Sequence, residues 1–229
     1  MIHWDKDVMN QANLVNEDLL EILNGFSENV AKKIPWDKMG YHGQDVDLDW
    51  YCSDEYLQKI VDAGRGHNGY PEHLVGVSPH PGDKHDMTCE DATLWHQIQQ
   101  ETSKLSLDLM SFVGASNRAL TAVYPPGGGI SWHNNANASA YNVIITWSEK
   151  GEGYWEHIDP NTKEHVRIPD KQGWQCKYGF FGQYEDGPHS LCYHKARTDC
   201  LRMTLGFMFN RDETGKNMAE MLIEEIETA

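Results

Sequence analysis

Apolar residues recur at helical spacing in four stretches of the chain, and these stretches predict its helices. The clearest begins at Asn16, a residue type that favours the N-cap, and continues with an apolar residue at every third or fourth position. Glu17 and Asp18 fall in its first turn, where the helix dipole favours negative charge. Thr88 and Asp91 resemble a capping box before another stretch. We predict helices over residues 16–34, 55–63, 88–113 and 217–228.

From Arg118 onward the pattern changes to short runs rich in Val, Ile, Thr and aromatic residues. Gly, Pro, Asn and Asp separate these runs, which is typical of an all-β arrangement. We predict strands at residues 118–124, 130–135, 141–148, 153–158, 164–168, 176–182, 189–195 and 200–209. Eight short strands indicate a jelly roll. The predicted fold is therefore α+β with a mainly β core, flanked by N-terminal helices and a C-terminal helix.

The chain shows no repeat and no low-complexity linker, so we expect a single domain over residues 1–229. Residues 1–117 would form a support region of helices and loops, 118–210 the jelly-roll core and 211–229 the C-terminal helix. The loop over residues 64–86 is long and rich in Gly, Pro and His, and loops of this length are usually functional or disordered. It suggests a lid, together with Trp50, Tyr51 and Tyr70.

Composition and charge narrow the function classes. The formal net charge of -16 argues against nucleic acid or an anionic membrane as the main partner. No stretch approaches the ~18 uncharged apolar residues of a membrane span, and the N-terminus lacks the layout of a signal peptide. The five cysteines contain no Cys-x-x-Cys pair, which favours reduced thiols and a cytoplasmic location.

The last predicted strand carries an arginine in an informative position. Apolar residues alternate along one face of this strand, whereas Arg202, Thr204 and Gly206 lie on the other. If that face looks into the roll, the guanidinium needs a partner, because an unpaired buried charge is too costly. A bound carboxylate would serve, held by two hydrogen bonds. The other interpretations are a solvent-facing arginine or an internal ion pair with one of the 35 acidic residues.

Two of the 12 histidines stand out by their neighbours. His133 precedes Asn135 by two residues, and in an extended segment these two side chains point to the same side. His194 ends one predicted strand while Arg202 stands early in the next, although His189 competes with His194 for this place. The pattern suggests a metal held by histidines, with an arginine nearby to hold an acid.

These residues resemble a known family. The segments Tyr124-Pro-Pro-Gly-Gly-Gly, Trp132-His133-x-Asn135, His194 and Arg202-x-Thr204 are similar to the iron(II)/2-oxoglutarate-dependent oxygenases, in their prolyl-hydroxylase-like branch and related proteins carried by phages. The resemblance covers residues 118–210. It implies a double-stranded β-helix that binds Fe(II) through His133 and His194 and the co-substrate 2-oxoglutarate through Arg202, assisted by Tyr124 and Thr204. Lys195 is the next candidate for the anchor.

Position 135 departs from the family, which has a carboxylate there. Asn135 either ligates iron through its amide oxygen, leaves that position open for water or an anion, or marks a degenerate site. Other residues that could contribute are Asn134, Asn137, Glu149, Glu152 and Glu156.

The resemblance therefore implies a hydroxylase of unknown substrate, either a small molecule or a peptide. The other hypothesis is a catalytically silent jelly roll that binds a small molecule or a protein. A cupin-like enzyme would need a His-x-His motif and a glutamate at fixed spacing, which the sequence lacks. The oligomeric state stays open.

Overall fold

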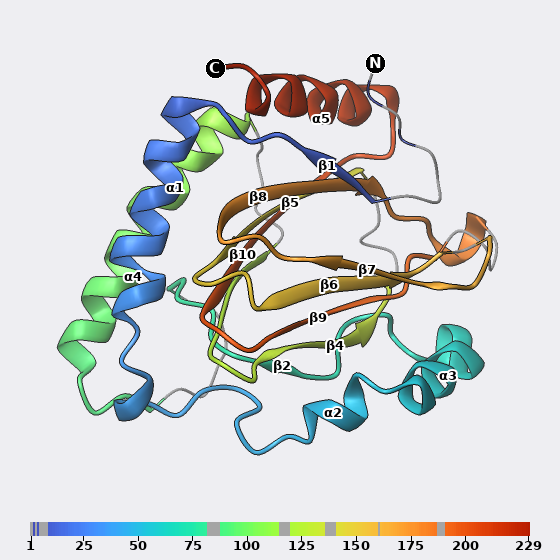
Figure 1. The fold of residues 1–229 in the computed structure, drawn as a ribbon, viewed down its shortest axis with the longest axis horizontal. Coiled ribbons are helices and arrows are strands. Elements are labelled where there is room, and N and C mark those ends of the chain that lie inside the picture. The colour runs from blue at the N-terminus through green and yellow to red at the C-terminus, as the bar shows by residue number, and fades with distance from the viewer. Residues whose placement is uncertain are drawn as a thin grey trace.

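Two five-stranded antiparallel sheets form the centre of the chain in a computed structural model (Figure 1). The structure describes residues 2, 4, 9–81, 88–114, 120–135, 141–159, 161–186 and 191–229. The first sheet has the order β1 (Asn10–Ala12), β8 (Gly173–Phe180), β5 (Tyr141–Ser148), β10 (Arg202–Phe209) and β3 (Leu120–Tyr124). The second has the order β2 (Leu74–Val75), β4 (Gly129–His133), β9 (His194–Thr198), β6 (Gly153–Ile158) and β7 (His165–Pro169).

Three helices cover the outer face of the first sheet (Figure 1). They are α1 (Glu17–Asn29), α4 (Ala92–Val113) and α5 (Glu213–Ile226). Two shorter helices, α2 (Leu48–Tyr51) and α3 (Asp54–Ala63), lie beside β4 of the second sheet. Short 3-10 turns occur at Ala31–Lys33, Trp36–Lys38, Gly64–Gly66 and Tyr184–Asp186. The predicted α+β fold with a β-rich core is therefore confirmed.

The helix ends follow from their caps. The Asn16 side chain accepts a hydrogen bond from the Leu19 amide at 2.9 Å, as its predicted N-cap role requires. The prediction that α4 begins at residue 88 is wrong, because Asp91 caps it through the Leu94 amide at 3.0 Å. The last helix begins at Glu213 rather than 217, with Asp212 as its cap.

Two strand predictions match the structure, and others are shifted along the chain. β5 and β6 have the predicted bounds. β8 covers Gly173–Phe180 rather than 176–182, and β9 covers His194–Thr198 rather than 189–195, of which residues 189 and 190 lie outside the described part of the chain. β1 and β2 were not predicted, since segments of three and two residues show no periodicity.

Alternation along the first sheet separates an apolar face from a polar one. Met203, Leu205 and Phe207 of β10 pack into the core beneath the helices. Arg202 and Thr204 point to the opposite face, toward the second sheet, and both line the cavity between the sheets. Residues paired across neighbouring strands share a face, so Ser148 and Thr146 of β5, which pair with Arg202 and Thr204, look the same way.

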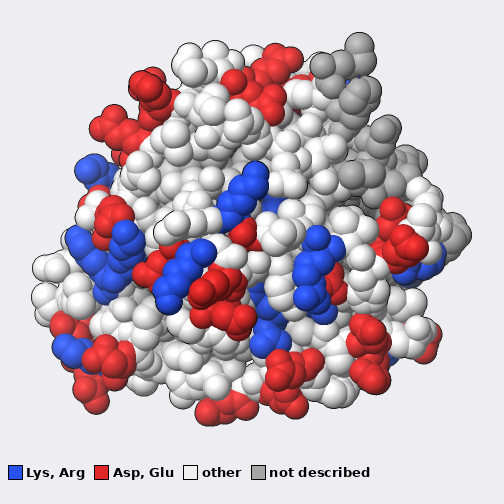
Figure 2. Space-filling model, in the orientation of Figure 1, with Lys and Arg blue, Asp and Glu red and all other residues white. Residues whose placement is uncertain are grey.

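Charged side chains are spread over the surface. On the face shown in Figure 2, Lys and Arg side chains lie interspersed with Asp and Glu rather than gathered in one patch. Within the described part of the chain, no helix combines the length and the apolar character that crossing a membrane requires.

The helical layer gives a test of the packing. Leu23 of α1 is 0% exposed, whereas Leu107 of α4 is 68% exposed. We expect Leu23→Ala to lower the free energy of unfolding by about 2–5 kcal/mol, because it removes apolar contacts and leaves a cavity. Leu107→Ala is the matched control and should change it by less than about 0.5 kcal/mol. Denaturant unfolding measures both, and equal effects would contradict the assigned packing of α1.

Candidate functional site

A cavity of about 280 Å³ lies between the two sheets, and all six residues predicted for the site line it. These six are Tyr124, His133, Asn135, His194, Arg202 and Thr204. The other residues around the cavity are mostly apolar or aromatic: Tyr70, Pro71, Ile130, Asn142, Ile144, Trp155, Phe181, Ala196, Gly206 and Met208. Strands and loops that lie far apart in the sequence therefore surround one space.

His133 and His194 are neighbours across two strands of the second sheet. They are register partners of β4 and β9, and their ring centroids are 4.1 Å apart. Each Nδ1 lies 2.8 Å from a backbone carbonyl oxygen two residues earlier, that of Ser131 or Cys192. A carbonyl oxygen only accepts, so Nδ1 donates and the neutral ring carries its lone pair on Nε2.

Burial keeps both rings neutral. It lowers the pKa of His133 to about 4 and the pKa of His194 well below its usual value, and the proximity of His133 lowers the pKa of His194 further. Neutral imidazole is the form that binds metals. The pair can therefore present two nitrogen donors to the cavity without first losing a proton.

Asn135 lines the cavity, but its backbone is not extended as predicted. β4 ends at His133, and Asn135 follows with a φ of 61°, in the left-handed region that Asn tolerates better than most residues. The expected alternation of an extended strand is therefore wrong at this position. Both side chains nevertheless line the same cavity.

The other candidate ligands that the structure describes take no part in lining the cavity. The Asn134 amide group donates to the Tyr184 hydroxyl at 3.0 Å. Glu156 is buried but is bound by His165 at 2.8 Å and Arg167 at 2.6 Å, while Glu149 and Glu152 are exposed. Asn137 and the competing His189 lie outside the described residues.

The donor set is thus two imidazoles and one amide. Among the described residues no Asp or Glu lines the cavity, and no group of three or more His, Cys, Asp and Glu side chains could hold a metal ion. Two nitrogen donors and a neutral oxygen fit a divalent transition metal such as Fe(II), with weaker binding than a site that has a carboxylate.

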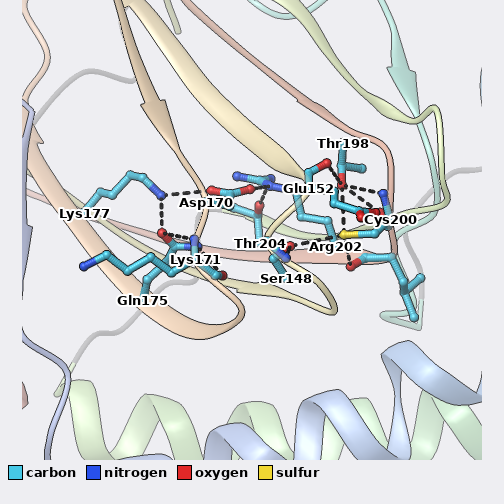
Figure 3. Close-up of polar contacts among 12 residues, drawn as sticks. Ser148, Glu152, Asp170, Lys171, Gln175, Lys177, Thr198, Cys200, Arg202 and Thr204 are labelled. Atoms are coloured by element: carbon cyan, nitrogen blue, oxygen red, sulfur yellow. Dashed lines mark hydrogen bonds and ion pairs between the residues drawn. The ribbon is translucent and has the colours of Figure 1, made fainter.

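Arg202 is buried, and some of its hydrogen-bond donors already have partners within the protein. Its Nε donates to Asp170 Oδ2 at 2.7 Å, and its Nη1 donates to Thr204 Oγ1 at 2.7 Å (Figure 3). The internal ion pair anticipated as one interpretation therefore exists. Nη2 has no hydrogen-bond partner among the residues that the structure describes, so the far edge of the guanidinium can still bind a carboxylate that enters the cavity.

Tyr124 adds a polar group at the Arg202 end of the cavity, and Thr146 lies on the same sheet face beside Thr204 without lining the cavity. Burial raises the pKa of Tyr124, although the Arg202 charge and the Thr204 hydroxyl oppose this, so its phenol stays protonated. The Thr146 hydroxyl is buried on the same sheet face and has no partner within the described chain. A water molecule would satisfy it.

Lys195 does not compete for the role of anchor. Its ammonium group donates to the Cys52 carbonyl oxygen at 2.7 Å and lies 3.3 Å from Glu156. It also stands 4.4 Å above the Trp132 ring. Because Lys195 follows His194 in the strand, it points to the other face of the second sheet, and it does not line the cavity.

The predicted lid contributes only in part. Tyr70 and Pro71 line the cavity. A hydrogen bond holds this segment next to the end of β4, because the backbone N–H of Asn134 donates to the Gly69 carbonyl oxygen at 3.1 Å. Trp50 and Tyr51 instead pack against Tyr56.

Sequence reasoning missed several neighbours of the site. The Trp155 ring stacks on His194 at 5.5 Å between centroids, and Phe181 lies 4.9 Å from the same ring. The run that contains Trp155 was predicted as a strand, but its period alone did not say which face meets the histidines. His157, which the sequence analysis did not single out, is buried and pairs with His194 in the strand register.

Two solved structures of prolyl hydroxylases are similar to this chain at low TM-scores. For a prolyl-4-hydroxylase from Pseudomonas putida the TM-score is 0.31, with 13% identity over 80% of this chain and 98% of that chain. For a viral collagen prolyl hydroxylase from Paramecium Bursaria Chlorella virus-1, in a 2OG complex, it is 0.28, with 12% identity over 74% and 93%. No family model and no curated protein matches the sequence. Such low TM-scores do not establish a shared fold.

The buried histidines predict how metal-free protein responds to acid. Burial lowers the pKa of His157 to about 4 from the ordinary 6.5. Between these pH values the unfolded chain takes up a proton that the folded protein refuses, so stability falls as pH falls, by up to about 1.4 kcal/mol per pH unit for each such histidine. His157→Asn should reduce this slope by up to that amount in unfolding experiments with a chelator present.

His96, which is exposed on α4, provides the control for this experiment. His96→Asn should leave the slope unchanged. A His157→Asn slope equal to that of the wild type would show that His157 is not held neutral by the fold.

Proposed function

We propose that this protein is an iron(II)- and 2-oxoglutarate-dependent oxygenase that hydroxylates a small molecule or a peptide. One observation carries the proposal: two neutral histidines and a buried arginine line the same cavity between the sheets. Metal-binding nitrogens and an acid-binding guanidinium in one space suit a metal that works together with an acidic co-substrate. The location in the cytoplasm and the single-domain boundaries stay predictions.

The proposal includes the fold. From β3 to β10 the chain passes repeatedly between the two sheets, with β3, β5, β8 and β10 in the first and β4, β6, β7 and β9 in the second. Such crossing is typical of a jelly roll. The two sheets would then be the two halves of a double-stranded β-helix, with the cavity between them.

The histidines and Asn135 would hold the metal. His133 and His194 would bind through Nε2, because their Nδ1 atoms donate to backbone carbonyls and fix each ring. Asn135 would contribute its amide oxygen. A bound iron ion supplies the oxygen chemistry, in which 2-oxoglutarate, O₂ and a substrate C–H group become succinate, CO₂ and a C–OH group.

Arg202 would hold the distal carboxylate of 2-oxoglutarate. Asp170 occupies Nε, so the carboxylate would bind at the remaining Nη donors, with Thr204 and Tyr124 beside it. A charge-assisted contact of this kind contributes about 1.5–3 kcal/mol. Thr204 accepts from Nη1 and so sets the angle of the guanidinium plane.

The apolar walls would keep water from the reacting atoms. Trp155 and Phe181 pack against the His194 ring, and Ile144 closes the first-sheet side. Exclusion of water strengthens each electrostatic contact inside the cavity. Tyr70 and Met208 are exposed and also line the cavity, which places them where a substrate would enter.

A second function is a binding protein for a small acid without catalysis. The observation that favours it is that no carboxylate of the described chain lines the cavity, so the site lacks the charged oxygen ligand that would retain iron most strongly. The Arg202 end would serve this function unchanged.

Metal content and product formation separate the two functions. Protein reconstituted anaerobically with Fe(II) should convert 2-oxoglutarate into succinate when O₂ is admitted. His194→Ala should lose at least about tenfold in iron affinity, whereas the exposed His96→Ala should behave like the wild type. If folded wild-type protein retains no iron and forms no succinate, the oxygenase proposal is wrong and the result favours the binding function.

Asn135 gives a separate prediction. Asn135→Asp adds a charged oxygen at a left-handed position that Asp also tolerates, so the affinity for Fe(II) should rise on the order of tenfold. Anaerobic titration of wild type and variant with Fe(II) measures this. Equal affinities in two folded proteins would mean that position 135 does not touch the metal.

A further inference from the structure

Three charged side chains are buried together at the Arg202 end of the cavity. Asp170 lies between two cations: its Oδ2 accepts from Arg202 Nε at 2.7 Å and its Oδ1 accepts from Lys177 Nζ at 3.2 Å (Figure 3). The exposed fractions of the three side chains are 0% for Asp170, 1% for Lys177 and 2% for Arg202. Sequence reasoning identified only the arginine.

The two cations differ in their access to the cavity. Arg202 lines it, whereas Lys177 does not. Lys177 pairs in register with Ile144 and therefore looks toward the interior, where Gln175 Oε1 accepts a second hydrogen bond from its ammonium group at 3.2 Å. Lys177 would thus not contact a ligand held by Arg202. Its charge would act on the ligand indirectly, by offsetting the charge of Asp170.

The trio of Arg202, Asp170 and Lys177 has an excess of positive charge. Burial and the Arg202 charge lower the pKa of Lys177, whereas Asp170 opposes this. With both cations charged, the two cations and one carboxylate carry a net charge of about +1 where almost none of their surface is exposed. If Asp170 faced Arg202 alone, the pair would be neutral, and the guanidinium would attract an incoming carboxylate much less. Burial would raise the pKa of Asp170, but the charges of Arg202 and Lys177 outweigh it and keep this carboxyl ionised.

We propose that Lys177 is a positioning residue for an acid-binding end of the cavity: it shares the charge of Asp170 and so leaves Arg202 able to bind a monoanionic carboxylate. The inference deepens the proposed function and rests on it. The two residues would have different roles. Asp170 orients the guanidinium through Nε, and Lys177 offsets the negative charge of Asp170.

Three variants of similar shape separate charge from structure. Lys177→Met gives the trio a net charge of zero, Asp170→Asn gives it +2, and the double variant restores +1. The asparagine introduced by Asp170→Asn keeps an oxygen that can accept from Arg202 Nε. The readout is the dissociation constant of 2-oxoglutarate with Fe(II)-loaded protein, measured without O₂, and the affinity for Fe(II) is measured separately on each variant.

We expect Lys177→Met to weaken 2-oxoglutarate binding on the order of tenfold, as loss of one nearby buried charge predicts. Asp170→Asn should bind more tightly than wild type, and the double variant should return to within about threefold of wild type. The affinity for Fe(II) should change much less, because Asp170 contacts Arg202 and Lys177 contacts Asp170, whereas neither contacts the two histidines. A purely structural role would not be rescued by removing the second charge.

Each other result contradicts the inference. Unchanged binding in Lys177→Met, or a double variant as weak as that single variant, overturns it while the proposed function stands. If Lys177→Met does not fold, Asp170→Asn and the double variant are compared directly, and equal affinities overturn it as well. Failure of the wild type to bind 2-oxoglutarate overturns the proposed function and this inference together.

Discussion

The burial of Arg202 constrains much of the architecture around it. A guanidinium between two sheets persists only with a carboxylate beside it, and Asp170 fills that place from the short connection where the chain passes from the second sheet to the first. The Asp170 amide donates to the Gly153 carbonyl at 2.8 Å, and a Cβ at position 153 would stand 2.7 Å from Asp170 Oδ2. A side chain at position 153 would therefore displace the carboxylate that pairs with Arg202, although Gly153 and Arg202 belong to different sheets.

The orientation of the two histidine rings depends on shorter-range contacts. Each ring donates to a carbonyl two residues back in its own chain segment, so its orientation depends on local backbone geometry and the register between β4 and β9. The apolar walls then prevent protonation, because they disfavour the charged ring. Two adjacent imidazoles would repel each other if both were charged. Their burial therefore supports the same neutral state that metal binding needs.

Period-two alternation explains why so much of the site was predictable. Along β10 it separates Met203 and Leu205 from Arg202 and Thr204, and the structure places these pairs on opposite faces. The alternation fails where the strand ends, and this is why Asn135 reaches the cavity through a left-handed turn. Lys177 shows a second limit, because a polar residue that alternates with apolar ones in a strand normally indicates a solvent-exposed face. Both faces of this sheet are covered, so Lys177 and its partner Asp170 are buried, and no pattern near them in the sequence reveals it.

Charge links the two ends of the cavity under the proposed function. The protein offers a neutral donor set at the histidines and a net positive charge at Arg202, and no described lining residue carries a negative charge to balance a divalent metal. The anions of the co-substrate would supply that balance. Metal and 2-oxoglutarate would then raise each other's affinity by the same factor, since linkage is reciprocal. In a site with a carboxylate at position 135 the protein itself would supply part of this charge, and the two ligands would depend on each other less.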